Sequence, residues 1–255
     1  MVLLCLLLIL LLVPSPNSAI CTIPPDGTGH VDIPSNWTKI PDMAFEQCTT
    51  LTSVTIPNTI TEIGDMAFQL IYLKDTLDIP DTVVSLGIAS FDKLEKLETH
   101  LKIGNGIKII PQDAFRDALI LESITLGKNV EVIGTQAFYR ARKVQEITFP
   151  DNIREIGTGA FGHLQTVSSY TFPRSLESIG QGAFLLNIFL VDVTFNSEVL
   201  VMGEQPFLKC ASLKAENVLY NKSISISVPA SQVNSTVDWG EVIAVHVHGP
   251  REDRR

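Results

Sequence analysis

Apolar residues recur along the chain with a fixed period. Eight of the twelve phenylalanines follow one another at intervals of 23 residues, with one interval of 24. Four further columns, at five, eight, twelve and fourteen residues before each of these phenylalanines, hold only apolar residues. Because the chain as a whole is 45% apolar, this regularity predicts eight copies of one unit that bury a shared core. The marker residues are Phe45, Phe68, Phe91, Phe115, Phe138, Phe161, Phe184 and Phe207.

Each repeat divides into short elements. In the central copy, Ile124 and Leu126 flank a polar residue, which predicts a short strand over 124–126 with one face buried. Gly127 ends that strand, and a second extended segment is expected over 130–133 before the chain turns again at Gly134. The position three residues after each phenylalanine is mostly apolar. Because residues three apart lie on one side of a helix, this spacing predicts a single helical turn. The expected fold is therefore a β-rich solenoid of eight coils of about 23 residues, with short parallel strands and single-turn helical segments.

The polar residue inside each first strand is expected to point outward and to form the candidate partner-binding face. This face consists mainly of hydroxyls with scattered charges. Its members are Thr55, Asp78, Lys102, Thr125, Thr148, Thr171 and Thr194, with Ser123, Glu146 and Ser169 two residues earlier in their repeats. One alternative is that threonine is simply a good exposed strand former. Another is an ice-binding face, which the charges interrupt.

The repeats resemble a known family. The pattern Ile124-x-Leu126-Gly127-x-x-Val130-x-x-Ile133-Gly134-x-x-Ala137-Phe138 is similar to the BspA-type leucine-rich repeat, and the similarity extends over residues 31 to about 213. The segment 226–233 is similar to the segment that often closes such arrays. The resemblance implies a leucine-rich-repeat solenoid, a secreted or surface protein and, in some members, adhesion. It supplies no catalytic residues.

The two ends of the chain have a different composition from the repeats. Residues 1–20 begin with an uncharged apolar run that is too short for a membrane span of about 20 residues, so a signal peptide is expected. A lipidated Cys21 and an uncleaved anchor stay open as alternatives. The expected organisation is a signal peptide at 1–20, an N-terminal cap at 21–30, repeats at 31–220, and capping strands and a tail at 221–255. This predicts a secreted or cell-surface protein whose mature chain is not stably inserted in a membrane.

The cysteines and the N-glycosylation motifs lie mainly near the ends of the repeat array. Cys48 and Cys210 share a column seven coils apart, about 34 Å, which excludes a disulfide between them. Cys21 and Cys48 are a candidate disulfide, with buried free thiols as the alternative. The motifs Asn-x-Ser/Thr make Asn36, Asn221 and Asn234 candidate glycosylation sites.

Charge and motifs favour binding over catalysis. The net charge of −9 argues against nucleic-acid binding. No nucleophile elbow, phosphate loop or metal-ligand spacing occurs; His246 and His248 lack a third ligand, and the other histidines are isolated. No cofactor or metal is expected. The sequence therefore predicts a non-enzymatic recognition or adhesion module for an extracellular protein or glycan. The alternatives are a coat protein without a dedicated ligand and, more remotely, a hydrolase.

Overall fold

The computed structural model describes residues 21–74, 76–94, 96, 100–197, 199–214, 217–220 and 225–227. The expected signal peptide, the sequons at Asn221 and Asn234, the pair His246 and His248, and the tail after residue 227 lie outside this part of the chain. Coil 1 is defined here as the repeat that contains Phe45, and coil 8 as the repeat that contains Phe207.

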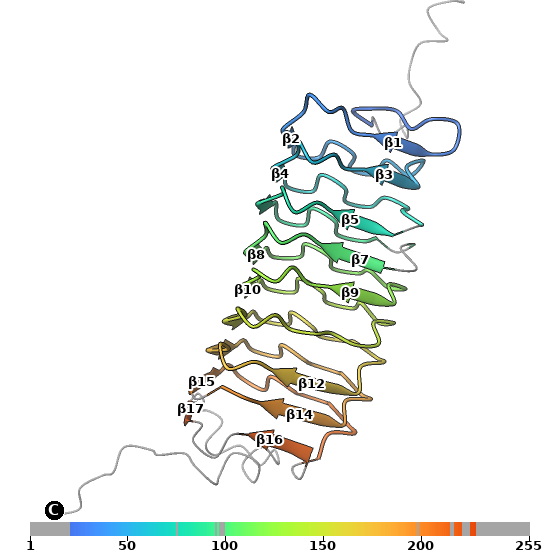
Figure 1. Ribbon diagram of the computed structural model, residues 1–255. Coiled ribbons are helices and arrows are strands. Elements are labelled where there is room, and N and C mark those ends of the chain that lie inside the picture. The colour runs from blue at the N-terminus through green and yellow to red at the C-terminus, as the bar shows by residue number, and fades with distance from the viewer. Residues whose placement is uncertain are drawn as a thin grey trace, which may run out of the picture.

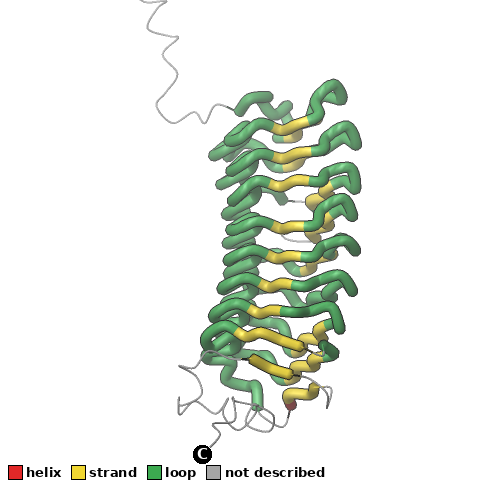
Figure 2. The backbone as a smooth tube through the Cα atoms, turned by 90° about the vertical axis from the view of Figure 1, so that its left-hand side faces the viewer, coloured by secondary structure: helices red, strands yellow, loops and turns green. Residues whose placement is uncertain are grey.

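Two columns of short strands run the length of the stack (Figure 1). The first column consists of β1 (His30–Asp32), β3 (Ser53–Thr55), β5 (Leu77–Ile79), β7 (His100–Ile103), β9 (Ser123–Thr125), β12 (Ser169–Phe172), β14 (Asp192–Phe195) and β16 (Val218–Tyr220). The second consists of β2 (Lys39–Ile40), β4 (Glu62–Ile63), β6 (Ser85–Leu86), β8 (Ile109–Ile110), β10 (Val132–Ile133), β11 (Glu155–Ile156), β13 (Ser178–Ile179), β15 (Val199–Met202) and β17 (Ser225–Ser227). Figure 2 shows the second column with the turns of successive coils stacked beside it.

Neighbouring coils pair in parallel and in register. Val31 lies opposite Val54, and Ile156 lies opposite Ile179, so each residue meets its counterpart one repeat later. The second column forms the sheets β2-β4-β6 and β8-β10-β11-β13-β15-β17. The first column forms β1-β3, β5-β7-β9 and β12-β14-β16. The strands β16 and β17 extend the stack beyond coil 8 with part of a further coil. The parallel solenoid expected from the repeat is thus confirmed.

The marker phenylalanines form one continuous stack in the core. All eight side chains are at most 2% exposed, and consecutive ring centroids lie 4.9–5.7 Å apart with planes within 10° of parallel. The other four columns also point inward, as their spacing predicts. Trp37, Val54 and Leu126 are half-buried exceptions, and the side chain of Val199 is not among those that the structure describes. The interior position of Phe138 and its counterparts confirms that the period of 23 residues is a packing constraint.

The expected single helical turn around each phenylalanine is wrong. Backbone φ is positive two residues before and two residues after each marker, for example 54° at Gln136 and 64° at Arg140, which an α-helix does not allow. The amides of Gln136, Phe138 and Arg140 instead donate to carbonyls of the next coil at 2.8 Å. Because alternate amides must point along the stack axis, the chain forms a series of tight turns. The spacing of three between apolar residues fits these turns as well as a helix.

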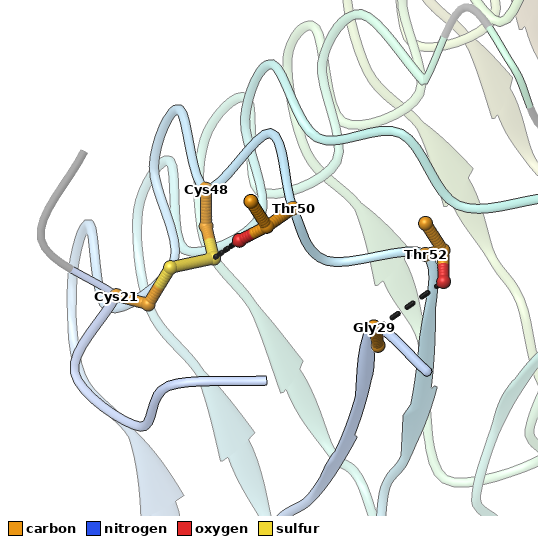
Figure 3. The surroundings of a disulfide bond; sticks show 5 residues. All are labelled: Cys21, Gly29, Cys48, Thr50 and Thr52. Carbon is orange, nitrogen blue, oxygen red and sulfur yellow. Dashed lines mark hydrogen bonds between the residues drawn. A yellow bond between two sulfur atoms is a disulfide. The ribbon is translucent and has the colours of Figure 1, made fainter. Parts of the chain in front are cut away.

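A short segment covers the first coil. Cys21 and Cys48 are joined by a disulfide with Cα atoms 5.4 Å apart (Figure 3). The amide of Thr22 donates to the carbonyl of Ala44 at 3.0 Å, which satisfies a backbone acceptor at the exposed end of the stack. Thr52 also bonds the Gly29 carbonyl through its hydroxyl. The structure therefore joins the two cysteines that were a candidate disulfide from the sequence, and the alternative of buried free thiols does not hold for this pair.

Candidate functional site

The candidate site is the outward side of the first strand column, called the strand face below. It comprises the side chains thirteen and fifteen residues before each marker phenylalanine. Parallel register places these side chains in rows, so Lys102 lies beside Thr125 and Thr171 beside Thr194. Exposed members are Asp32, Thr55, Thr76, Asp78, Lys102, Thr125, Glu146, Thr148, Ser169, Thr171 and Asp192, whereas His30, Ser53, His100, Ser123 and Thr194 are half-buried. The structure thus gathers the residues named from the sequence on one side of the molecule.

The strand face is divided among three sheets, which the repeat pattern did not predict. The first column is unpaired between β3 and β5, and coil 6 has no strand at this position. Thr148 of coil 6 is nevertheless exposed between buried Ile147 and Phe149, so its side chain keeps the outward direction of its neighbours. The apolar columns preserve the direction of side chains even where the ladder of backbone hydrogen bonds is interrupted.

Two histidines on this face each contact two hydroxyls of the next coil. His30 places Nδ1 2.7 Å from the Ser53 hydroxyl and Nε2 3.1 Å from the Thr55 hydroxyl. His100 makes the same contacts, at 2.7 and 3.2 Å, with the serine and threonine of β9. Sequence reasoning treated both histidines as isolated. The signal that could have revealed them is a histidine followed one repeat later by Ser-x-Thr.

Two shallow hollows lie on the strand face. One, of about 660 Å³, spans coils 2 to 4, and the other, of about 350 Å³, spans coils 6 to 8. Residues lining the first include Thr55, Asp78, Asp81 and Lys102; those lining the second include Glu146, Thr148, Asp151, Ser169, Thr171 and Asn196.

The polar groups of these hollows suit a hydrogen-bonding partner. The pKa of Asp81 is lowered because its carboxylate accepts hydrogen bonds from the backbone and side chain of Asn105. Within the described residues, no ion pair involves Asp78, Lys102 or Glu146. The strand face therefore offers hydroxyls and charged side chains to a ligand, with Asp78 and Lys102 opposite one another in neighbouring strands.

The other residues named from the sequence lie away from this face. Asn36 is exposed at the corner after β1. Cys210 is a buried thiol that donates to the Phe184 carbonyl at 3.2 Å, and burial raises its pKa to about 12. Among the residues that the structure describes, no group of three or more His, Cys, Asp or Glu side chains is placed to hold a metal ion. In the same part of the chain, no helix is long and apolar enough to cross a membrane.

The repeat sequence and the stacked coils agree with one family. A model of the BspA type leucine rich repeat region matches residues 28–140 and 108–228, with six copies. The chain belongs to the BspA-type leucine-rich repeat family. Membership confirms the resemblance seen in the Gly-x-x-Ala-Phe step of its repeats. No curated protein matches the sequence.

Solved structures share the fold of this BspA-type chain. A leucine-rich cell surface protein from Faecalibacterium prausnitzii is 24% identical, with a TM-score of 0.50 over 76% of this chain and 60% of its own. A leucine-rich repeat protein from Bacteroides ovatus is 23% identical, with a TM-score of 0.54 over 78% and 62%. The T. pallidum leucine-rich repeat protein is 21% identical, with a TM-score of 0.56 over 74% and 79%. The chain spans about three fifths of the first two proteins, and at these identities the likeness concerns the solenoid alone.

Proposed function

We propose that the chain is a secreted or surface-exposed recognition module that binds an extracellular protein or glycan through its strand face. The observation that carries the proposal is the row of exposed hydroxyls and charges on in-register coils, including Thr125, Thr148 and Thr171. Solenoid repeats place equivalent side chains at regular intervals, which produces an extended surface for a partner. The apolar run at residues 1–20 supports export, and Asn36 is proposed as a glycosylation site.

The second strand column is a weaker candidate for this role. Its charged side chains largely neutralise one another across coils: Lys108 lies 3.0 Å from Glu131, and Arg154 lies 2.9 Å from Glu177. A partner would have to disrupt these pairs before using them. On the strand face, the charges of Asp78 and Glu146 are available for contacts with hydroxyl or amide donors of a ligand.

The test is substitution of two exposed threonines by a large cation. The double variant Thr148→Arg, Thr171→Arg is expected to abolish capture of the partner in a pull-down from the organism's extracellular material, with an unchanged melting temperature. A matched control is Thr59→Arg, Thr61→Arg, because both residues are exposed threonines just before β4 of the second strand column. Equal capture by both variants would contradict the proposal.

A coat protein without a dedicated ligand is the alternative. The exposed Leu219 at the last strand of the first column is consistent with contact between copies. That reading predicts self-association of the purified chain, visible as large species in light scattering. A recognition module is expected to stay a single small species at the same concentration.

A further inference from the structure

The turn segments and return loops of coils 5 to 7 carry no acidic residue. These segments are 135–145, 158–168 and 181–191, in a chain whose net charge is −9. In coils 1 to 4 the equivalent segments carry carboxylates, among them Asp42, Glu46, Asp65, Asp92, Asp113, Asp117 and Glu122, and in coil 8 the equivalent segment carries Glu204. This side of the molecule therefore carries no acidic side chain over three successive coils, and its cations Arg140, Arg142 and Lys143 all belong to coil 5.

Several cations on this side lack a carboxylate partner. Arg140 pairs with Asp117 of coil 4 at 2.9 Å, but no ion pair among the described residues involves Arg142, Lys143 or Lys209. The Nε of Arg142 has no hydrogen-bond partner there either. His163 lies between these cations.

The lowered pKa of His163 is consistent with positively charged surroundings. Its pKa is lowered, first by burial and then by the positive charges of Arg142, Arg140 and Lys209. The cations of coils 5 and 8 therefore act on one point of the surface.

Coil 7 is apolar where coil 5 is cationic. Its turn segment and return loop place Leu185, Leu186, Ile188, Phe189 and Val191 at the positions that Tyr139, Arg140, Arg142, Lys143 and Gln145 occupy two coils earlier. The side chain of Phe189 is 57% exposed, and those of Ile188 and Val191 are 36% and 37% exposed. Packing within the chain leaves these groups in contact with water.

The cations and the apolar group form one patch. Arg142 and Ile188 occupy the same place in their repeats, as do Lys143 and Phe189, and two coil steps of roughly 4.8 Å separate them. The coils stack in a regular column, so equivalent positions follow one another along the axis (Figure 2). The name apolar-basic patch is used below for Arg142, Lys143, Ile188, Phe189 and Val191.

We propose that the apolar-basic patch docks onto a lipid bilayer surface that carries anionic headgroups. A bilayer of this kind satisfies both halves of the patch: headgroups neutralise Arg142 and Lys143, and the boundary with the acyl chains receives Phe189. A soluble polyanion would leave Phe189 in water. An apolar protein surface would leave the two cations without counter-charges. The docking is peripheral and uses a side of the coil distinct from the strand face.

The test measures partition of the full chain onto vesicles by co-sedimentation at low salt. Binding is expected to vesicles of phosphatidylcholine with phosphatidylglycerol and not to phosphatidylcholine alone. The double variant Arg142→Glu, Lys143→Glu is expected to lower partition at least about 25-fold, because each lost cation accounts for about fivefold. Phe189→Ser is expected to lower it about tenfold through the loss of apolar burial.

Matched variants elsewhere on the surface provide the controls. Lys74→Glu, Lys128→Glu makes the same change in net charge, and Ile109→Ser removes an apolar side chain that is also 57% exposed. Both are expected to keep most of the binding. Absence of binding, equal binding to neutral vesicles, or equal losses in the controls would overturn the proposal. So would self-association without vesicles that Phe189→Ser abolishes, because that result would assign the patch to a second copy of the chain.

Discussion

The two halves of the stack fill the same coil in different ways. In coils 1 to 4, the position twelve residues before the marker phenylalanine is always isoleucine, and among the described residues each marker ring stacks only on neighbouring marker rings. In coils 6 to 8, that position is Phe149, Phe172 or Phe195, and Tyr170 joins them, so strand rings contact the marker rings. One repeat length therefore accommodates either an aliphatic or an aromatic interior.

The halves also differ in how they are secured. In the aliphatic half, which comprises coils 1 to 4, a disulfide joins Cys21 to Cys48 at the N-terminal end. The aromatic half, which comprises coils 6 to 8, contains the buried side-chain amide of Asn187. Most other coils have an apolar residue at this position, three residues after the marker phenylalanine. The comparison indicates that covalent closure supports the half with fewer aromatic contacts, and that hydrogen bonding fixes the arrangement of the half with more.

The largest expected effect tests the aromatic contacts. Phe184→Ala should reduce the free energy of unfolding by about 5 kcal/mol and Phe68→Ala by about 3 kcal/mol, within the usual range for a buried phenylalanine. Phe184 contacts Tyr170 at 4.7 Å and Phe172 at 5.5 Å in addition to its stack neighbours, and aromatic pairs add to the cost of truncation. Urea denaturation followed by circular dichroism measures both values. Equal losses would show that the two interiors are energetically alike.

The next effect tests covalent closure. Cys21→Ala with Cys48→Ala should cost about 3 kcal/mol, because the open loop regains entropy in the unfolded chain. Alanine already occupies this column at Ala118 and Ala141, so the substitution introduces no new polar group. Cys210→Ala in the aromatic half is the control and should cost about 1 kcal/mol. Melting temperatures under oxidising and reducing conditions check the pair, since the wild type and Cys210→Ala should respond to reductant and the Cys21→Ala, Cys48→Ala variant should not.

A smaller effect tests the buried amide. Asn187 accepts a hydrogen bond from the Leu164 amide at 2.9 Å and donates to the Tyr170 hydroxyl at 3.0 Å. Asn187→Leu should cost about 2 kcal/mol, because both groups lose a partner inside the core. Adding Tyr170→Phe removes one of the orphaned groups and should recover part of this loss. A double-mutant cycle in urea measures the coupling, and strict additivity would argue against a working hydrogen bond.

The fold was predictable because the same pattern of inward-facing apolar positions recurs in every repeat. The inward direction of the marker phenylalanines and of their companion columns follows from apolar periodicity, and the outward direction of Thr148 follows from the alternation around it. The direction of backbone hydrogen bonds is not encoded in that alternation. The turns around Phe138 were therefore mistaken for helix, and the interrupted strand in coil 6 was not foreseen.

Contacts between equivalent positions were harder to predict. The bridge from His30 to Ser53 joins residues 23 apart, and it becomes visible only when the repeats are superimposed. Asn187 departs from an apolar column, yet it is buried because a hydroxyl from another column, that of Tyr170, satisfies its amide. The apolar-basic patch combines residues of coils 5 and 7, so no single repeat reveals it. The candidate strand face was predictable residue by residue, whereas its division into three sheets was not.

The turns around the marker phenylalanines align their backbone hydrogen bonds along the stack axis. In every coil from 1 to 7, three amides of the turn donate to carbonyls of the following coil, and none of these bonds runs the other way. Their dipoles add along the long axis as they do in a helix, whereas dipoles within a sheet nearly cancel. Along the edge formed by these turns, the amide ends of the dipoles point toward coil 8 and the carbonyl ends toward coil 1, whereas other bonds between coils, such as that from the Gly134 amide to the Ile110 carbonyl, point the opposite way. The dipole of the turns is therefore opposed by bonds elsewhere in each coil, and its effect is local to the edge of the stack where the turns lie.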